Sequence, residues 1–248
     1  MKKLASLAVL LCAASAWSEP VVIDGGAFQS PLVLDDEVVS LPVASFKLDA
    51  VQVSNRDFQK FVEKNPQWQR GNVPGIFSDH NYLRHWQSPL QAGEDINDLP
   101  VTRVSWYAAR AYCESQGGRL PSKDEWEYVS QQIRQLDGIS DKEYARHVFS
   151  WYSNPNSENL KAVGSGTASA NGIHDLHGLV SEWVEDFQLL MTNGDDADLL
   201  TSSCGDTARF MANYDTASYA TFFRYQSRSN YQPHTTTSTL GFRCAWSL

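Results

Sequence analysis

Long hydrophobic runs, basic charge and cysteine are all scarce in this sequence. Beyond an apolar run near the N-terminus, no segment approaches the roughly 18 to 20 apolar residues that a membrane-spanning helix needs, so no membrane insertion of the remaining chain is expected. Lysine and arginine number 20 against 29 aspartate and glutamate residues, which gives a formal net charge of -9. An acidic surface of this kind argues against nucleic acid and against an anionic membrane as partners.

The N-terminal apolar run has the layout of a secretory signal peptide. Lys2 and Lys3 precede an apolar stretch over residues 4–14, and small residues suited to cleavage follow it. We therefore expect residues 1–18 to be removed and residues 19–248 to form a soluble periplasmic protein. Because the signal carries two lysines and no acidic residue, the charge of the mature chain becomes -11.

The small number of cysteines limits the redox chemistry. Of four cysteines, Cys12 lies within the signal, which leaves Cys113, Cys204 and Cys244 in the mature chain. In an oxidising compartment, three cysteines predict one disulfide and one remaining thiol.

Local patterns predict strands and helices in a single domain. Alternating apolar residues predict strands over residues 21–28, with a turn at Gly25–Gly26, and over residues 38–53. From residue 150 onward, glycine, asparagine, serine and threonine predominate, and only the terminal LGFRCAW reads as a strand. With neither a repeat nor a linker, we predict one α+β domain with much irregular structure. Helices are predicted to begin after four capping serines: Ser54, Ser105, Ser122 and Ser140.

Two segments have a predicted pattern of burial. Residues 65–99 are irregular but rich in aromatic side chains, which argues for a packed loop rather than a disordered linker. The helix after Ser122 begins with a capping box to Glu125. Its apolar stripe, which we expect to be buried, consists of Trp126, Val129, Ile133 and Leu136.

The stretch NGIHDLHGLVSEWVEDF, residues 171–187, concentrates turn formers, carboxylates and histidines. Asp175 and Glu182 place carboxylates seven residues apart, and Gly178 between them can offer a backbone carbonyl. Such alternating oxygens suit a calcium loop, and an ordinary solvated loop is the alternative. The same stretch holds two candidate ligands for a transition metal: His174 and His177.

Five segments occur in the order found in a known family. They read VVIDGGAF, VQVSNRDFQKFV, PVTRVSWYAARAYCESQGGRLPSKDEWEYVS, NGIHDLHGLVSEWVEDF and RSNYQPHTTTSTLGFRCAW, and they are spread over nearly the whole length of the mature chain, from residue 21 to residue 246. In these segments the chain resembles the formylglycine-generating enzyme, or sulfatase-modifying factor, family. The resemblance implies a compact, loop-rich, C-type-lectin-like fold over residues 19–248.

The resemblance also implies roles for individual residues. In secreted members of the family, the cysteines that correspond to Cys113 and Cys244 form a disulfide. One calcium site of the family uses an aspartate-type residue, a glutamate and two backbone carbonyls between them. The corresponding positions in this chain are Asp175, Gly178, Val180 and Glu182.

The chain departs from the family at the catalytic centre. Counted back from GFRC without gaps, the two copper-binding cysteines of the active enzyme fall near Asp215 and Ala220. Paired thiolates hold a soft copper(I) ion, at which oxygen is activated to convert a substrate cysteine into an aldehyde. A carboxylate and a methyl group do not hold copper in this way, so formylglycine formation by the usual mechanism is not expected.

Two functions from different classes follow. The first is an accessory or maturation module that binds a periplasmic protein or peptide, with the aromatic segment 214–231 as contact area. A looser resemblance to NirV-type accessory proteins, associated with copper nitrite reductase, suggests a copper or respiratory enzyme as the partner. The second is a metal-dependent oxidoreductase in which Cys204 holds copper or non-haem iron, aided by His174, His177 or His234.

Overall fold

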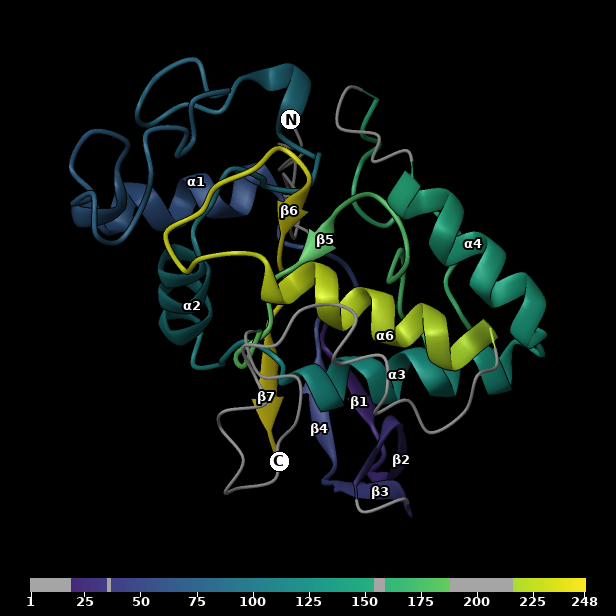
Figure 1. The fold of residues 1–248 in the computed structure, drawn as a ribbon. Helices are drawn as coiled ribbons and strands as arrows, with labels where there is room; N and C mark the ends of the chain where they lie inside the picture. Colours follow the sequence, from purple (N-terminus) through teal and green to yellow (C-terminus); the bar gives the residue numbers. More distant parts are fainter. Residues whose placement is uncertain (1–18, 35–36, 154–158, 188–215) are drawn as a thin grey trace, which may run out of the picture.

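The computed structural model describes residues 19–34, 37–153, 159–187 and 216–248, and a three-stranded antiparallel sheet joins the two ends of this fold (Figure 1). The order of its strands is β1-β4-β7. The C-terminal strand therefore pairs with a strand from the first quarter of the chain. The three strands are β1 (Val21–Ile23), β4 (Phe46–Leu48) and β7 (Ala245–Ser247).

Two smaller sheets complete the strand pairing. In the first, β2 (Gly26–Leu34) and β3 (Glu37–Val43) form an antiparallel hairpin. In the second, β5 (Ser181–Glu182) and β6 (Leu240–Gly241) pair in parallel. This short parallel pair holds the carboxylate-rich stretch 171–187 beside the C-terminal motif. The predicted terminal strand is thus divided between β6 and β7, which belong to different sheets.

The capping serines predict the starts of the first four helices correctly. The Ser54, Ser105 and Ser122 side chains each accept a backbone N–H of the first helical turn, and Ser122 forms the predicted capping box with Glu125. No helix in the described part of the chain is long and apolar enough to cross a bilayer. The four helices are α1 (Asn55–Lys64), α2 (Trp106–Ser115), α3 (Lys123–Leu136) and α4 (Asp141–Ser153).

Helix α6 (Thr216–Ser229) overturns the prediction of little regular structure after residue 150. Its sequence, TASYATFFRYQSRS, is rich in serine, threonine and aromatic residues, which have modest helix propensity. Tertiary contacts stabilise it instead, because the first part of α6 packs against α4 (Figure 1). Their shared apolar contact is formed by Tyr144, Ala145, Val148, Ala217 and Ala220.

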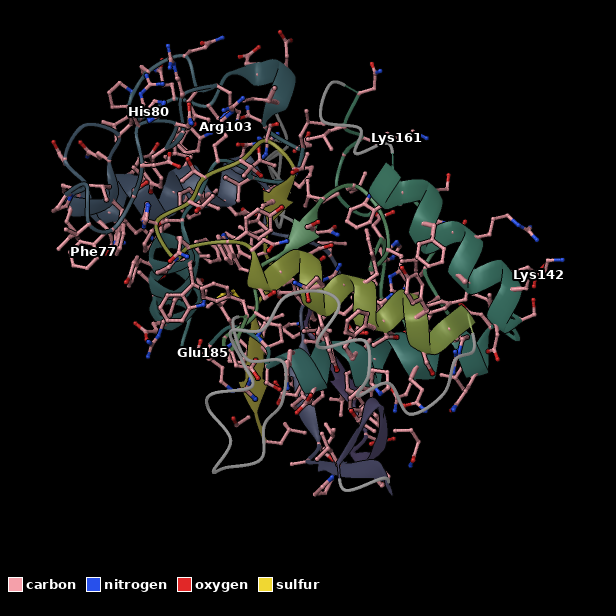
Figure 2. The ribbon with its side chains drawn as sticks, in the orientation of Figure 1. Phe77, His80, Arg103, Lys142, Lys161 and Glu185 are labelled. Atoms are coloured by element: carbon pink, nitrogen blue, oxygen red, sulfur yellow. A yellow bond between two sulfur atoms is a disulfide. The ribbon has the colours of Figure 1, made fainter. Side chains whose placement is uncertain are left out.

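The predicted packed loop and helix stripe are confirmed, except at Phe77 in the loop, which is 37% exposed, and at Leu136 in the helix. Within residues 65–99, which include the 3₁₀ helices η1 (Pro66–Trp68) and η2 (Glu94–Ile96), Tyr82 and Trp86 are buried. The loop side of the molecule, marked by Phe77 and His80, lies opposite the α4 side, marked by Lys142 (Figure 2). In α3, the side chains of the stripe are buried except that of Leu136, which ends the helix and is 60% exposed.

Candidate functional site

Glu182 on β5 is buried, and both of its carboxylate oxygens are bonded to protein donors. The Arg243 guanidinium forms a two-pronged ion pair, with Nη2 2.8 Å from Oε1 and Nε 2.9 Å from Oε2. Gln52 Nε2 donates to Oε1 at 2.8 Å, and Trp126 Nε1 donates to Oε2 at 2.8 Å. Four N–H groups therefore satisfy this carboxylate.

Arg243 is itself fully buried and fully bonded. Besides Glu182, it donates through Nη1 to the backbone carbonyls of Asp49 and Ala50 at 3.1 and 3.2 Å, and through Nη2 to that of His174 at 3.0 Å. All five N–H groups of the guanidinium thus have acceptors, as a buried charge requires. We call Arg243, Glu182, Gln52 and Trp126 the Arg243 cluster. The sequence contains its arginine in the GFRC motif, but no local pattern predicts the partners.

This arrangement does not fit a calcium ion held by Glu182. The guanidinium occupies the place that a cation beside that carboxylate would take, and a second positive charge there would be repelled. The carbonyl of Gly178 also has a donor, Val180 N at 2.7 Å. Of the predicted ligand atoms, Asp175 Oδ2 is buried without a hydrogen-bond partner. The geometry thus gives no support to calcium ligation through Glu182, and the calcium assignment rests on the resemblance alone.

Calcium removal should leave the thermal stability of the protein unchanged, because Arg243 supplies the positive charge that Glu182 needs. The measurement is the melting temperature of the mature chain in excess chelator and in millimolar calcium. A melting temperature that rises with calcium, by an amount that disappears in Asp175→Asn, would instead establish a calcium site.

The two histidines of the stretch are tied to different neighbours. His174 Nδ1 lies 2.9 Å from the Gly166 carbonyl, which can only accept, so Nδ1 carries a proton. His177 Nε2 lies 2.9 Å from the Ser130 hydroxyl. In the described ranges, no three or more His, Cys, Asp or Glu residues gather where they could hold a metal ion. Metal ligation by this histidine pair thus gains no support from the geometry and stays a prediction.

The predicted disulfide is present. Cys113 in α2 and Cys244 before β7 are bonded, with their Cα atoms 5.5 Å apart, and both are fully buried. They are the only cysteines among the described residues. Cys204, the candidate catalytic thiol, and Asp215 lie outside the described residues.

Ala220, where a gap-free count places the second catalytic thiol, lies inside α6 and is fully buried. Its methyl group belongs to the apolar contact between α6 and α4. No thiol is present at this position in the chain, and the surroundings are those of a helix packing interface.

Asp49, beside the Arg243 cluster, has an unusual titration. Its Oδ2 accepts the Cys244 backbone N–H at 3.0 Å, and burial raises the pKa of its carboxyl group to about 7. The folded chain therefore keeps a proton that the unfolded chain loses near pH 4. This group's contribution to stability is largest at low pH and falls as pH rises from about 4 to about 7.

Asp49→Asn should consequently stabilise the chain at pH 8 by roughly 1 to 3 kcal/mol and change it little at pH 4. The amide keeps an oxygen that can accept from Cys244 while removing the buried charge. Urea unfolding of variant and parent at both pH values tests this. An equal difference at the two pH values would show that Asp49 is not protonated in the fold.

Comparisons with known proteins agree with this fold. The profile described as the sulfatase-modifying factor enzyme 1-like domain matches residues 12–248. The protein named inactive C-alpha-formylglycine-generating enzyme 2 from Bos taurus is 29% identical and covers 91% of this chain and 87% of its own. Its namesake from Mus musculus is 28% identical, with coverages of 82% and 75%. The Mus musculus formylglycine-generating enzyme is 26% identical, with coverages of 82% and 66%.

Among solved structures, PvdO from Pseudomonas aeruginosa superposes with a TM-score of 0.53 at 18% identity, covering 92% of this chain and 94% of its own. At this identity the likeness concerns the fold alone. It agrees with the compact mixture of helices, short strands and long loops described above, which is the C-type-lectin-like fold expected from the sequence. The chain belongs to the family of the sulfatase-modifying factor enzyme 1-like domain.

Proposed function

We propose that this chain is a non-catalytic member of its family that acts by binding another protein or peptide. The observation that carries the proposal is the state of the cysteines: both cysteines of the described residues are joined in the Cys113–Cys244 disulfide. Ala220, the position expected for one catalytic thiol, is a buried alanine. A pair of thiolates is what copper(I) chemistry of this type needs. Similarity to two relatives named as inactive supports the same proposal.

The exposed aromatic side chains of α6 are the proposed contact surface. Of the aromatic residues in segment 214–231, Tyr219 is 48% and Phe223 36% exposed, whereas Phe222 and Tyr225 are buried. Phe149 of α4 extends this surface, with its ring centroid 5.6 Å from that of Tyr219. Exposed neighbouring aromatic rings supply contact area in protein interfaces.

The proposed setting is the periplasm, with a copper or respiratory enzyme as the partner. A disulfide that links distant parts of the chain suits an oxidising compartment. The choice of partner rests on the looser resemblance to NirV-type accessory proteins. Residues 1–18, the proposed signal peptide, lie outside the described residues.

Cross-linking in periplasmic extract tests the proposed surface. The parent chain should form a defined product with one protein, and Tyr219→Ser combined with Phe223→Ser should lose it. Ile76→Ser is a matched control, because Ile76 is 74% exposed on the loop side of the molecule. Equal cross-linking by all three proteins, or none by the parent, would contradict the proposal.

The alternative, an oxidoreductase that uses Cys204, predicts a different composition. Copper or iron would copurify in a one-to-one ratio and would be lost in Cys204→Ser. The non-catalytic proposal expects one titratable thiol under denaturing conditions, without copper or iron. Elemental analysis and thiol titration of protein from an oxidising compartment distinguish the two.

A further inference from the structure

The outer face of α4 carries two cations beside the aromatic surface described above. Lys142, Arg146 and Phe149 follow one another at intervals of four and three residues, so they share one face of the helix. Lys142 and Arg146 are exposed, whereas Phe149 is half-buried. Figure 2 shows Lys142 on the outer side of α4, pointing away from the rest of the molecule. A row of positive charge therefore continues along α4 from the ring of Phe149.

The three aromatic rings form one cluster. The ring centroid of Phe149 lies 5.6 Å from that of Tyr219 and 5.9 Å from that of Phe223. Tyr219 and Phe223 are four residues apart on α6, and so they lie on the same face of that helix. Rings at such distances attract one another, yet both rings of α6 remain partly exposed. An apolar side chain of a partner can cover this area.

The two cations are available to a partner because the carboxylates of α4 are bonded elsewhere. Asp141 pairs with Arg134 at 3.2 Å. Glu143 Oε2 accepts the Ser140 hydroxyl at 2.6 Å and the Ser140 backbone N–H at 3.2 Å. Among the residues that the structure describes, neither cation forms an ion pair or a side-chain hydrogen bond.

Unpaired positive charge stands out in a chain whose formal net charge is -9. The net charge repels an acidic segment, so the cations of α4 determine where such a segment can approach and in which orientation it binds. Carboxylates suit both cations. A guanidinium can bind a carboxylate through two parallel N–H groups, and an ammonium group pairs with it as a point charge.

We infer that the partner segment that covers this surface is acidic, with an apolar anchor next to a run of carboxylates. The inference rests on the proposed function, because it gives the chemistry of the partner for the same surface. The anchor packs on the three rings, and the carboxylates pair with Arg146 and Lys142. Along the axis of α4, these cations lie roughly 5 and 10 Å from Phe149. Each residue of an extended segment advances by about 3.3 Å, so carboxylates within three residues of the anchor reach both cations.

Fluorescence anisotropy of the mature chain with two labelled peptides tests the inference. The first peptide has two leucines followed by three glutamates, and in the second peptide lysines replace the glutamates. We expect saturable binding of the acidic peptide, at least about tenfold tighter than that of the basic peptide. High salt should weaken it, because salt screens exposed charges. No saturation by the acidic peptide at millimolar concentration, or equal affinities for the two peptides, would overturn the inference.

Charge reversal locates the site. Lys142→Glu combined with Arg146→Glu should weaken binding of the acidic peptide at least about tenfold. The matched control is Lys47→Glu combined with Arg84→Glu, which changes the net charge by the same amount at exposed positions on β4 and on the loop side. The control should bind nearly as the parent does, and equal weakening by both pairs would contradict the location. Lys142→Gln combined with Arg146→Gln keeps the test valid if the reversed pair does not fold.

The cross-linked product in periplasmic extract distinguishes this inference from the proposed function. Loss of the product in Tyr219→Ser with Phe223→Ser and also in Lys142→Glu with Arg146→Glu would support both. Loss in the aromatic pair alone would leave the proposed function standing and overturn the acidic partner. If the parent formed no product but bound the acidic peptide through α4, the periplasmic partner would be contradicted and the preference for an acidic segment supported.

Discussion

The Arg243→Met variant is expected to lose roughly 3 to 5 kcal/mol of unfolding free energy, because it leaves the Glu182 charge buried without its counter-ion. It also removes the donors to three backbone carbonyls, those of Asp49, Ala50 and His174. Methionine fills much of the space of the arginine stem, so the loss reports mainly on charge and hydrogen bonds. Urea unfolding at neutral pH gives the value directly.

Two further variants test the reason for this loss. Arg243→Lys should restore only part of the lost unfolding free energy, since an ammonium group has three donors where the guanidinium uses five. Arg56→Met removes an ion pair with Asp98 whose side chains are 52% and 67% exposed, and it should cost less than about 1 kcal/mol. If Arg243→Met lost as little unfolding free energy as Arg56→Met, the Arg243 cluster would not contribute to stability as its geometry indicates.

Replacing both cysteines of the disulfide, as Cys113→Ala with Cys244→Ala, is expected to cost about 5 kcal/mol. The two residues are separated by 131 positions, and a cross-link that closes so long a loop removes much entropy from the unfolded chain. The bond also fastens α2 to the C-terminal segment that carries Arg243. Denaturant unfolding under oxidising conditions measures the difference.

Reduction supplies the control for this prediction. Excess thiol reductant should lower the stability of the parent to that of the double variant and leave the double variant unchanged. A loss below about 1 kcal/mol in both experiments would mean that the unfolded chain is already compact without the bond.

Much of the fold was predictable because its signals are local. The first three capping serines and the capping box at Ser122 lie where their short-range patterns place them. Helix α6 was missed for the opposite reason. Its sequence has little helix preference, and its stability comes from distant residues: Arg224 and Arg228 both pair with Glu127 of α3. A local sequence pattern does not predict ion pairs between residues that are so far apart in the chain.

The candidate site was predictable only in part. The sequence singles out Asp175 and Glu182 as carboxylates that need a cation, and Glu182 does need one. Its cation is Arg243, which lies 61 positions away and becomes a neighbour through the pairing of β5 with β6. The disulfide was obtained from the resemblance, because the spacing of three cysteines leaves the pairing open.

The most direct test of the central proposal, that this chain does not catalyse formylglycine formation, is an activity measurement on the mature chain. The protein is incubated with a cysteine-containing substrate peptide of the active enzyme, copper, oxygen and a thiol reductant, and the peptide is followed by mass spectrometry beside an active family member. We predict that the cysteine remains intact while the active enzyme converts it to an aldehyde. Aldehyde formation by this chain, abolished in Cys204→Ser, would contradict the account and establish a catalytic thiol.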